Sequence, residues 1–371
     1  MPLKILHTAD LHVGMTFNNR NYPEAVRRSL VEARYGVLER LVELANTEQC
    51  RLLIIAGDLF HRSNMAAEAV ARVIKILSRF AGCVALLPGN HDYYDPYGSI
   101  WKELRVGAFD SLILLDKPRP FPLHDYGIDA VLYPAPCDRK HSAENRLGWI
   151  RDSERPAGRW QIGVAHGAVQ GVSPDFNDQY FPMTEAELAG LKLHHWCLGH
   201  THARYPDRDE AGSHPFFYSG TPEPDGFDCR HGGYVWIVEL DEGGACRCRS
   251  VETGRYRFQE LEKSVSSAAD LAALQEELAP GGDKLLLKLK LSGTLPEADF
   301  QSRGVWFKQL GEALVYLEKD DSELAVELTP ALIAQKFPAT SFPYRLLARL
   351  AARDDREALQ LAYRLIGEVT K

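Results

Sequence analysis

The sequence predicts an α/β fold with buried, mostly parallel strands, followed by a small α+β domain. Three observations support this fold class. Five short, nearly continuous apolar runs are typical of buried strands. Two longer segments between the first three runs carry apolar residues at helical spacing. From about residue 260 helical and alternating patterns follow one another, and 371 residues with 45% hydrophobic content suffice for two domains. We expect them at 1–259 and 260–371.

The elements of the larger domain can be placed in order along the chain. The two predicted helices, Tyr22 to Thr47 and Met65 to Phe80, each connect two consecutive strands. Right-handed crossovers of this kind place helices on the faces of a layered sheet. The five predicted strands are Leu3 to Leu6, Arg51 to Ala56, Cys83 to Leu87, Trp160 to Ala165 and Trp196 to Leu198.

Each predicted strand ends in polar residues that suit a metal ion. Asp, Asn and neutral His are the ligands that a pair of divalent cations needs, and loops beyond buried strands can gather them. Each motif alone is ordinary, because Gly-Asp is a common turn and a single histidine is more often a hydrogen-bonded core residue. Together they indicate a metal site. The motifs are Asp10-Leu11-His12, Gly57-Asp58-Leu59-Phe60-His61, Gly89-Asn90-His91-Asp92, Ala165-His166-Gly167 and Gly199-His200-Thr201-His202.

In this order, the five motifs resemble those of the calcineurin-like metallophosphoesterase superfamily, over roughly the first 240 residues. The resemblance implies a four-layer αββα sandwich core and two metal ions bridged by Asp58. Two such metals activate a bridging water that attacks phosphorus in line. The implied ligands are Asp10, His12, Asp58 and His202 for one metal and Asp58, Asn90, His166 and His200 for the other.

The residues after Asn90 are candidates for proton transfer. His91 follows a ligand, and its imidazole can be protonated near neutral pH, so we expect it to act on the leaving oxygen. Asp92 has two interpretations that the sequence leaves open. It either orients His91 or is a turn residue that caps the following loop.

The flanks of the motifs narrow the resemblance to the SbcD-type (YhaO-like) DNA repair exonucleases. These flanks are Asp10-Leu11-His12-Val13-Gly14 and Gly57-Asp58-Leu59-Phe60-His61-Arg62-Ser63. The resemblance implies that His61 faces the active site and assists with the phosphate; the alternative is a loop histidine at a helix entry. The run from Phe217 to Leu240 also resembles this group. Its apolar alternation, broken by Gly and Pro, predicts a hairpin-like excursion.

The segment after residue 260 is expected to form a small α+β cap. The resemblance implies that such a cap sits over the nuclease and helps to select and open duplex ends. The last two helices either pack on the cap or dock the coiled coil of an SbcC-like ATPase. The predicted elements are a helix over Ser264 to Leu278, an exposed strand over Lys284 to Ser292 with Leu285, Leu287, Leu289 and Leu291 on one face, a short strand over Ala313 to Glu318, and helices over Tyr344 to Ala352 and Asp354 to Val369, with Asp354 as an N-cap.

The aromatic run Tyr93 to Trp101 follows His91 directly. Its rings could stack on a base of a frayed DNA end. A packed lid over the site is the alternative, and we favour it slightly.

The net charge of −8, split as −4 and −4 between the two parts, gives no basic DNA clamp. Two divalent cations would offset about four of these charges where phosphate arrives. Most of the basic residues considered for DNA contact are expected to be ordinary solvated surface residues. These are Arg20, Arg27, Arg28, Arg62, Arg139, Lys140 and Arg146.

The seven cysteines are dispersed and odd in number, which favours reduced thiols in a cytoplasmic protein. Only Cys246 and Cys248 approach a metal-binding spacing, and we expect them on opposite faces of a strand. The chain has no apolar run near the about 18 to 20 residues of a membrane span. The first strand begins at Leu3, leaving no room for a signal peptide.

These patterns predict a two-metal, manganese-dependent DNA exonuclease and endonuclease that processes double-strand breaks. The expected cofactors are two Mn²⁺ ions, and the expected partners are DNA ends, with single strands as a further substrate, an SbcC-like ATPase and a second copy of the chain. One alternative is a general phosphoesterase acting on small phosphodiesters or phosphomonoesters. Another is a DNA-end binding or scaffold subunit whose catalysis is incidental.

Overall fold

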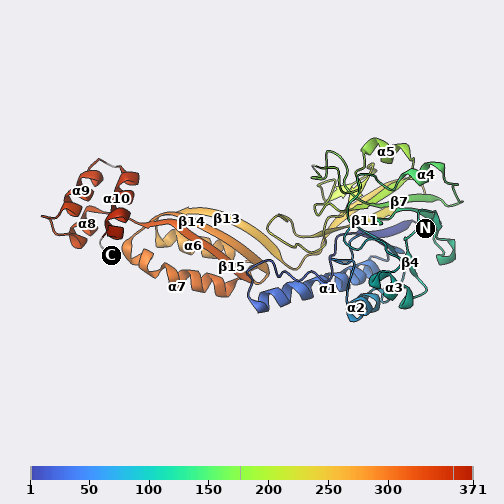
Figure 1. Cartoon of the computed structure of the whole chain (residues 1–371), viewed down its shortest axis with the longest axis horizontal. Coiled ribbons are helices and arrows are strands. Elements are labelled where there is room, and N and C mark those ends of the chain that lie inside the picture. Colours follow the sequence, from blue (N-terminus) through green and yellow to red (C-terminus); the bar gives the residue numbers. More distant parts are fainter. Residues whose placement is uncertain (1, 176, 354, 370–371) are drawn as a thin grey trace. The chain divides into compact units, whose positions relative to one another are not determined.

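The computed structural model describes residues 2–175, 177–353 and 355–369 (Figure 1). The chain folds into two compact units, Met1–Phe258 and Gln259–Lys371. Among the described residues, no helix combines the length and the apolar character needed to cross a membrane.

The first unit contains a seven-stranded sheet in the order β4-β3-β2-β1-β11-β12-β9. The strands β1 to β4 are parallel, because a helix or crossover returns the chain between them. The strand β11 pairs antiparallel with β1 and with β12, and β9 lies antiparallel at the edge. The strands are β1 (Leu3–Thr8), β2 (Leu52–Ala56), β3 (Cys83–Leu87), β4 (Leu112–Leu114), β9 (Glu210–Ala211), β11 (Tyr234–Leu240) and β12 (Cys246–Glu252).

A second sheet of the first unit has the order β10-β8-β7-β6-β5. The strands β6, β7, β8 and β10 are parallel, and β5 is antiparallel to β6. The fourth and fifth predicted strands fall in β7 and β8. The strands are β5 (Phe121–Pro122), β6 (Ala130–Ala135), β7 (Trp160–His166), β8 (His195–Gly199) and β10 (Phe217–Tyr218), and a 3₁₀ turn, η1 (His124–Tyr126), lies between β5 and β6.

Helices cover both outer faces of the paired sheets. In Figure 1, α2 and α3 lie on one side of the first unit, and α4 and α5 lie on the other. Successive residues of a strand point to opposite faces, so Leu53 packs with the helices while Leu52 faces the second sheet. The predicted four-layer αββα sandwich is therefore confirmed. The helices are α1 (Glu24–Thr47), α2 (Ala67–Leu77), α3 (Ser99–Val106), α4 (Gly148–Asp152) and α5 (Glu185–Gly190).

The segment from β10 to β11 differs from the predicted hairpin. The strand β10 pairs with β8 in the second sheet, whereas β11 pairs with β1 in the first. The segment therefore crosses between the layers, and the Trp236 indole N–H donates to the carbonyl oxygen of Tyr218 across 2.8 Å. Glycine and proline indicate where the chain turns, but they do not determine which strands pair after the turn.

The aromatic run after His91 is only partly a loop. Trp101 lies in α3, is 1% exposed and donates from its indole N–H to the carbonyl oxygen of Tyr93 at 2.9 Å. Tyr94 contacts the Trp101 ring edge-on at 5.8 Å between centroids. Tyr97 is 94% exposed. Packing therefore accounts for Tyr94 and Trp101, and Tyr97 is the exposed ring available for contact with a ligand.

Cys246 and Cys248 correct one expectation from the sequence. Their side chains lie on the same face of β12, with the sulfur atoms 3.5 Å apart, and not on opposite faces. The prediction was wrong because side chains alternate with a period of two, so residues i and i+2 of a strand share a face. All seven cysteines are free and buried.

The second unit contains a three-stranded sheet in the order β13-β14-β15. The predicted exposed strand is in fact β14, the central strand, and its leucines are buried against α6 and α7. Alternation shows that one face is buried, but it does not show whether both edges are paired. The elements are β13 (Arg257–Val265), α6 (Ala268–Leu278), η2 (Gly282–Lys284), β14 (Leu285–Leu295), α7 (Glu297–Ala313) and β15 (Tyr316–Val326).

The helices α6, α7 and α8 of the second unit differ from the prediction, and α8 (Pro330–Lys336) has no predicted counterpart. The helix expected from Ser264 begins at Ala268, because Ser267 and Asp270 form a capping box there. The helix α7 was not predicted. Only Phe307 and Leu310 of its residues are buried, so its helical apolar pattern is weak.

The C-terminal helices are α8 (Pro330–Lys336), α9 (Phe342–Ala351) and α10 (Arg356–Val369). Leu347 and Leu359 pack together in their common core, whereas Leu361 and Leu365 are about half exposed. The predicted cap Asp354 lies outside the described residues. The Ala358 N–H donates to the Asp355 carboxylate at 3.0 Å, which caps the start of α10.

Candidate metal centre

The predicted ligands meet at the carboxyl ends of five strands, β1, β2 and β3 of one sheet and β7 and β8 of the other. Ligands commonly bind at this end of parallel strands. His166 is the last residue of β7, and the other ligands lie in the loops that follow their strands. Five of them, Asp10, His12, Asp58, Asn90 and His166, are at most 2% exposed. The sandwich thus buries polar side chains from four separate segments in one place.

Asp58 lies between two groups of predicted ligands. Its Oδ2 atom is 3.8 Å from His12 Nε2 and 3.5 Å from His166 Nε2. On the first side, His12 Nε2 and His202 Nε2 are 3.1 Å apart. On the second side, Asn90 Oδ1 is 2.9 Å from His166 Nε2 and 3.3 Å from His200 Nδ1. This arrangement places a carboxylate where it can reach two cations.

The donor atoms have the spacing that divalent cations need, and two of the four ligand imidazoles are in the neutral form. Neighbouring ligands around a cation with bonds of about 2.1 Å lie about 3 Å apart, close to the 3.1 Å between the nitrogens of His12 and His202. Burial lowers the pKa of His12 well below its usual range and that of His200 to about 3. Both rings are therefore neutral, which is the form that binds metals.

The backbone of the first two motifs is held in an unusual conformation. Asp10, His12 and Asp58 have φ values of 54°, 49° and 53°, and such left-handed conformations cost about 1–3 kcal/mol per residue. Hydrogen bonds between the two loops hold them in place. The N–H of Asp10 donates to Gly57 O at 3.1 Å, and that of His12 donates to Asp58 O at 3.0 Å. The strain turns both carboxylates and the imidazole toward one point.

Two glycines allow the loops to approach the ligands closely. Gly57 has φ +94°, and a Cβ atom there would lie 2.2 Å from His166 Nδ1. A Cβ atom on Gly89 would lie 2.1 Å from Asp58 Oδ1. A side chain at either position would therefore displace a predicted ligand.

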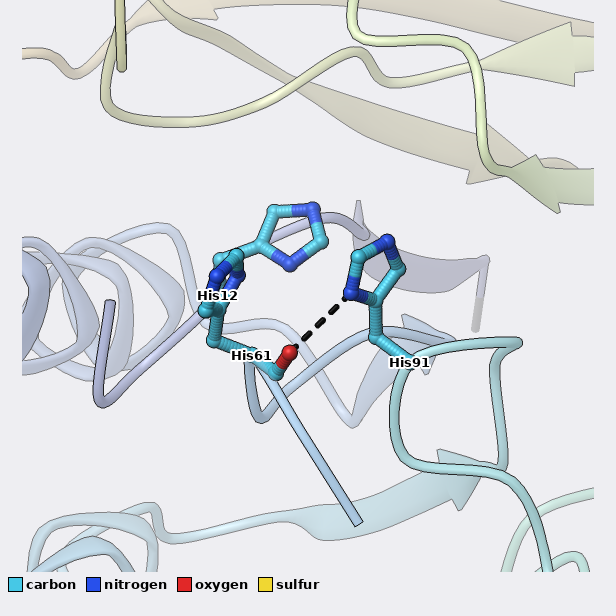
Figure 2. Close-up of side chains that lie close together, drawn as sticks. All are labelled: His12, His61 and His91. Carbon is cyan, nitrogen blue, oxygen red and sulfur yellow. Dashed lines mark hydrogen bonds between the residues drawn. The ribbon is translucent and has the colours of Figure 1, made fainter. Parts of the chain in front are cut away.

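His12, His61 and His91 form a cluster of three imidazole rings, drawn in Figure 2. The rings of His61 and His91 are stacked, with their centroids 5.4 Å apart. The ring centroids of His12 and His91 are 4.9 Å apart. His91 Nδ1 lies 3.0 Å from the carbonyl oxygen of His61. A carbonyl only accepts, so Nδ1 carries the proton of this bond. Burial is the main cause that lowers the pKa of His61 to about 4, so this ring is neutral.

Asp92 contacts backbone N–H groups. Its carboxylate oxygens accept from Gly89 N at 2.7 Å and from Phe60 N at 3.0 Å. This differs from the prediction that Asp92 orients the His91 ring, since the ring is held by His61 O instead. The turn interpretation is closer to the geometry. Asp92 joins the loop after β3 to the loop after β2, and so positions Asn90 and Asp58.

Arg34 and Asp225 support the site but were not singled out from the sequence. His202 Nδ1 lies 3.4 Å from Asp225 Oδ2, and the fully buried Arg34 lies 3.9 Å from the same oxygen. Burial acts to raise the pKa of Asp225, but His202 and Arg34 hold it well below its usual range. One signal was available for Arg34, a charged residue that falls on the apolar face of α1 between Leu30 and Val37.

We expect Asp225→Asn to weaken metal binding by about 10- to 100-fold, the usual effect of removing a partner that orients a metal-binding histidine. The amide keeps the shape of the side chain but loses the charge that holds His202 Nδ1. Calorimetric titration with Mn²⁺ measures this change. Asp228→Asn, at an exposed aspartate of the same loop, is the matched control and should bind as the wild type does. Equal affinities for the two variants would show that Asp225 does not support the site.

Comparisons with known proteins agree with this geometry. A family model described as Calcineurin-like phosphoesterase matches residues 3–204. The uncharacterized metallophosphoesterase YhaO of Bacillus subtilis is 26% identical over 80% of this chain and 73% of its own length. The DNA double-strand break repair protein Mre11 of Methanopyrus kandleri is 28% identical over 67% of this chain and 57% of its own length. The SbcD subunit of the SbcCD nuclease of Staphylococcus saprophyticus is 33% identical over 27% of this chain and 26% of its own length.

Solved structures resemble the chain only distantly. The crystal structure of the protein TT1561 of Thermus thermophilus has a TM-score of 0.42 at 11% identity, and it covers 68% of this chain and 100% of its own. A dimetal phosphatase from Danio rerio has a TM-score of 0.37 at 13% identity with the same coverage. The family match, in contrast, contains every predicted ligand from Asp10 to His202. The chain therefore belongs to the calcineurin-like phosphoesterase family and is a metal-dependent phosphoesterase.

Proposed function

We propose that this protein is a two-metal DNA exonuclease and endonuclease that processes double-strand ends in DNA repair. The observation that carries the proposal is the position of His61 beside His12 and His91, next to the two groups of ligands that share Asp58. The names of the Mre11 and SbcCD relatives support DNA as the substrate. The chain aligns with little more than half of the Mre11 relative and about a quarter of the SbcCD subunit, so their activities enter only as support.

Seven residues are the proposed metal ligands, in two groups of four that share Asp58. Asp10, His12, Asp58 and His202 would hold one cation, and Asp58, Asn90, His166 and His200 would hold the other. Mixed oxygen and nitrogen ligands suit Mn²⁺, which we propose as the native metal. When bound, the pair lowers the pKa of a bridging water so that hydroxide is available at neutral pH.

The chain's own residues would then stabilise the departing oxygen. His91 is anchored twice, since its backbone N–H donates to Asp58 Oδ1 at 2.9 Å and its Nδ1 is held by His61 O. In its doubly protonated form, with Nδ1–H held by the carbonyl oxygen of His61, the ring would donate its Nε2 proton to the leaving oxygen. His61, neutral and stacked on His91, would donate a hydrogen bond to the phosphate.

Charge favours one alternative, a general phosphoesterase for small substrates. The net charge is −8, and several basic candidates are paired with acids. Arg27 and Arg28 contact Glu24, and Arg139 and Arg146 contact Asp138. Cations already paired in this way add little to the attraction of a DNA backbone.

We expect Mn²⁺-dependent cleavage of a blunt, end-labelled DNA duplex, with weaker activity in Mg²⁺ and none after chelation. Cyclic nucleotides and p-nitrophenyl phosphate, assayed with the same protein, serve as the small-substrate comparison. Hydrolysis of the small esters without any cleavage of DNA, in either metal, would decide for the general phosphoesterase. Metal-depleted protein that binds DNA ends and still performs its cellular task would instead favour the scaffold role.

Exposed apolar residues on the C-terminal helices support the proposal that a protein partner binds there. Phe342 is 73% exposed, and Leu361 and Leu365 are 48% and 49% exposed, although Leu347 and Leu359 of the same helices are buried. The helices thus pack on one another and keep apolar residues at the surface. An SbcC-like coiled-coil ATPase is the partner we propose for them, and homodimerisation is a further proposal.

A further inference from the structure

A second group of metal-binding side chains lies between the two sheets. Cys246 and Cys248 of β12 and His195 of β8 are 8%, 3% and 1% exposed. Their ligand atoms all lie within 4.8 Å of one another. The two strands belong to different sheets, so the cluster spans the layer between them. Both cysteines lie beyond residues 3–204, the range that the family model matches.

The spacing of the three side chains is close to that of a tetrahedral metal site. The sulfur atoms of Cys246 and Cys248 are 3.5 Å apart, and His195 Nδ1 lies 3.7 Å from Cys246 Sγ. Around Zn²⁺, tetrahedral geometry gives about 3.8 Å between two sulfur ligands and about 3.6 Å between sulfur and nitrogen. The observed distances differ from these values by a few tenths of an ångström. The three atoms therefore need little movement to share one cation.

We propose that His195, Cys246 and Cys248 bind a borderline divalent cation such as Zn²⁺, at a site separate from the two-metal centre. His195 begins β8, whereas His200 follows its end. Five residues of strand extend over about 16 Å, which separates the two sites. A cation there would connect β8 with β12 and stabilise the contact between the sheets.

Charge balance suits a cation in this apolar layer. Two thiolates and a neutral imidazole neutralise a divalent ion, so the complex would bury no net charge. A bound cation would displace the thiol protons, because cysteine binds metals in its thiolate form.

Cys197 is the natural candidate for a fourth ligand. It lies two residues after His195 in β8, so both side chains are on the same face of the strand. Cys197 is fully buried and belongs to the same core cluster as Cys246 and Cys248.

Titration with Co²⁺ tests the proposed cysteine site by a signal that oxygen and nitrogen ligands do not give. All predicted ligands of the two-metal centre are oxygen or nitrogen atoms, so a thiolate-to-Co²⁺ charge-transfer band reports a cysteine ligand. The other cysteine to distinguish is Cys229, whose sulfur lies within 4.8 Å of ligand atoms of His202 and Asp225. We expect reduced full-length protein, titrated with Co²⁺ without oxygen, to develop this band, which should saturate by about three ions per chain, one at this site and two at the two-metal centre. Added Zn²⁺ should remove the band.

Three variants assign the band to its ligands. Cys246→Ala and Cys248→Ala should each lose most of the band, whereas Cys83→Ala should keep it. Cys83 is the matched control, because it is 2% exposed and lies in the same layer but outside the cluster. Retained hydrolysis of a small phosphodiester in Mn²⁺ would show that the variants are folded.

Two outcomes would overturn the proposal. One is the absence of the band from reduced wild-type protein, a result that does not depend on how any variant folds. The other is a band that survives in folded Cys246→Ala and Cys248→Ala. Neither outcome bears on the proposed nuclease activity, which the DNA assay tests separately.

Discussion

Asp58→Asn is expected to lower metal-dependent phosphodiester hydrolysis by at least about 1,000-fold, because the bridging position loses its charge. The asparagine keeps an oxygen that can accept the His91 N–H, so the loop after β3 retains that contact. It loses the negative charge that faces His12 and His166 from a distance of 3.8 Å and 3.5 Å. Both proposed cations depend on that charge, so we expect binding of both to weaken together.

The measurement for this variant combines metal content with rate. Bound Mn²⁺ per chain and hydrolysis of bis-p-nitrophenyl phosphate should fall together in Asp58→Asn. Asp110→Asn, an exposed aspartate before β4, is the control and should match the wild type in both. A variant that binds two Mn²⁺ ions as tightly as the wild type would rule out the bridging role.

The fold of Asp58→Asn should survive without metal. Burial acts to lower the pKa of His166, but Asp58 and Asp10 raise it to about 9, so the metal-free protein holds a buried ion pair. When Asp58 becomes asparagine, the burial effect is less opposed and His166 can lose its proton. The variant thus avoids the cost of a buried unpaired charge. Circular dichroism of the two metal-free proteins should therefore be alike.

His91→Asn is expected to lower kcat by about 100- to 10,000-fold, the range for loss of a general acid, while Mn²⁺ affinity stays unchanged. The backbone N–H that contacts Asp58 Oδ1 remains in the variant, so the ligand loop keeps its position. The loss should be large for DNA, whose leaving alkoxide needs a proton. It should be much smaller for bis-p-nitrophenyl phosphate, because nitrophenolate leaves without one.

His61→Asn is the companion variant. It changes the neighbouring ring of the same cluster and keeps the carbonyl oxygen that accepts from His91 Nδ1. We expect a smaller loss that is similar for both substrates, since His61 is assigned to the phosphate and not to the leaving oxygen. Equal losses for DNA and the nitrophenyl ester in His91→Asn would contradict its assignment as the proton donor.

The predicted ligands could be found from the sequence because each lies within a few residues of a strand end. Asp10, Asp58 and Asn90 follow strands whose apolar runs are evident, so their location at one edge follows from the parallel order. Helices on the sheet faces were predictable for the same reason, since buried parallel strands require them, whereas the four-layer αββα arrangement was implied by the family resemblance. The pairing of strands across long connections could not be predicted from the sequence, as the segment from β10 to β11 shows.

The supporting contacts could not be read from the sequence, because they join segments that are distant along the chain. Asp225 meets His202 and Arg34 across loops and layers. Asp92 binds the backbone of Phe60 in a neighbouring loop. The central position of β14 likewise depends on which strands flank it. Such partners leave no periodic pattern in the sequence.

The sequence by itself determined the chemistry available to this protein, the ligand types and the strand ends that carry them, because these are local properties of short motifs. Only the tertiary structure decided which of these groups touch. It placed Asp58 between the two groups of ligands, held His91 on His61 O, and brought His195 of one sheet to Cys246 and Cys248 of the other. The reason is physical: these contacts follow from the packing of two sheets, whose relative positions depend on the whole core and not on any single segment.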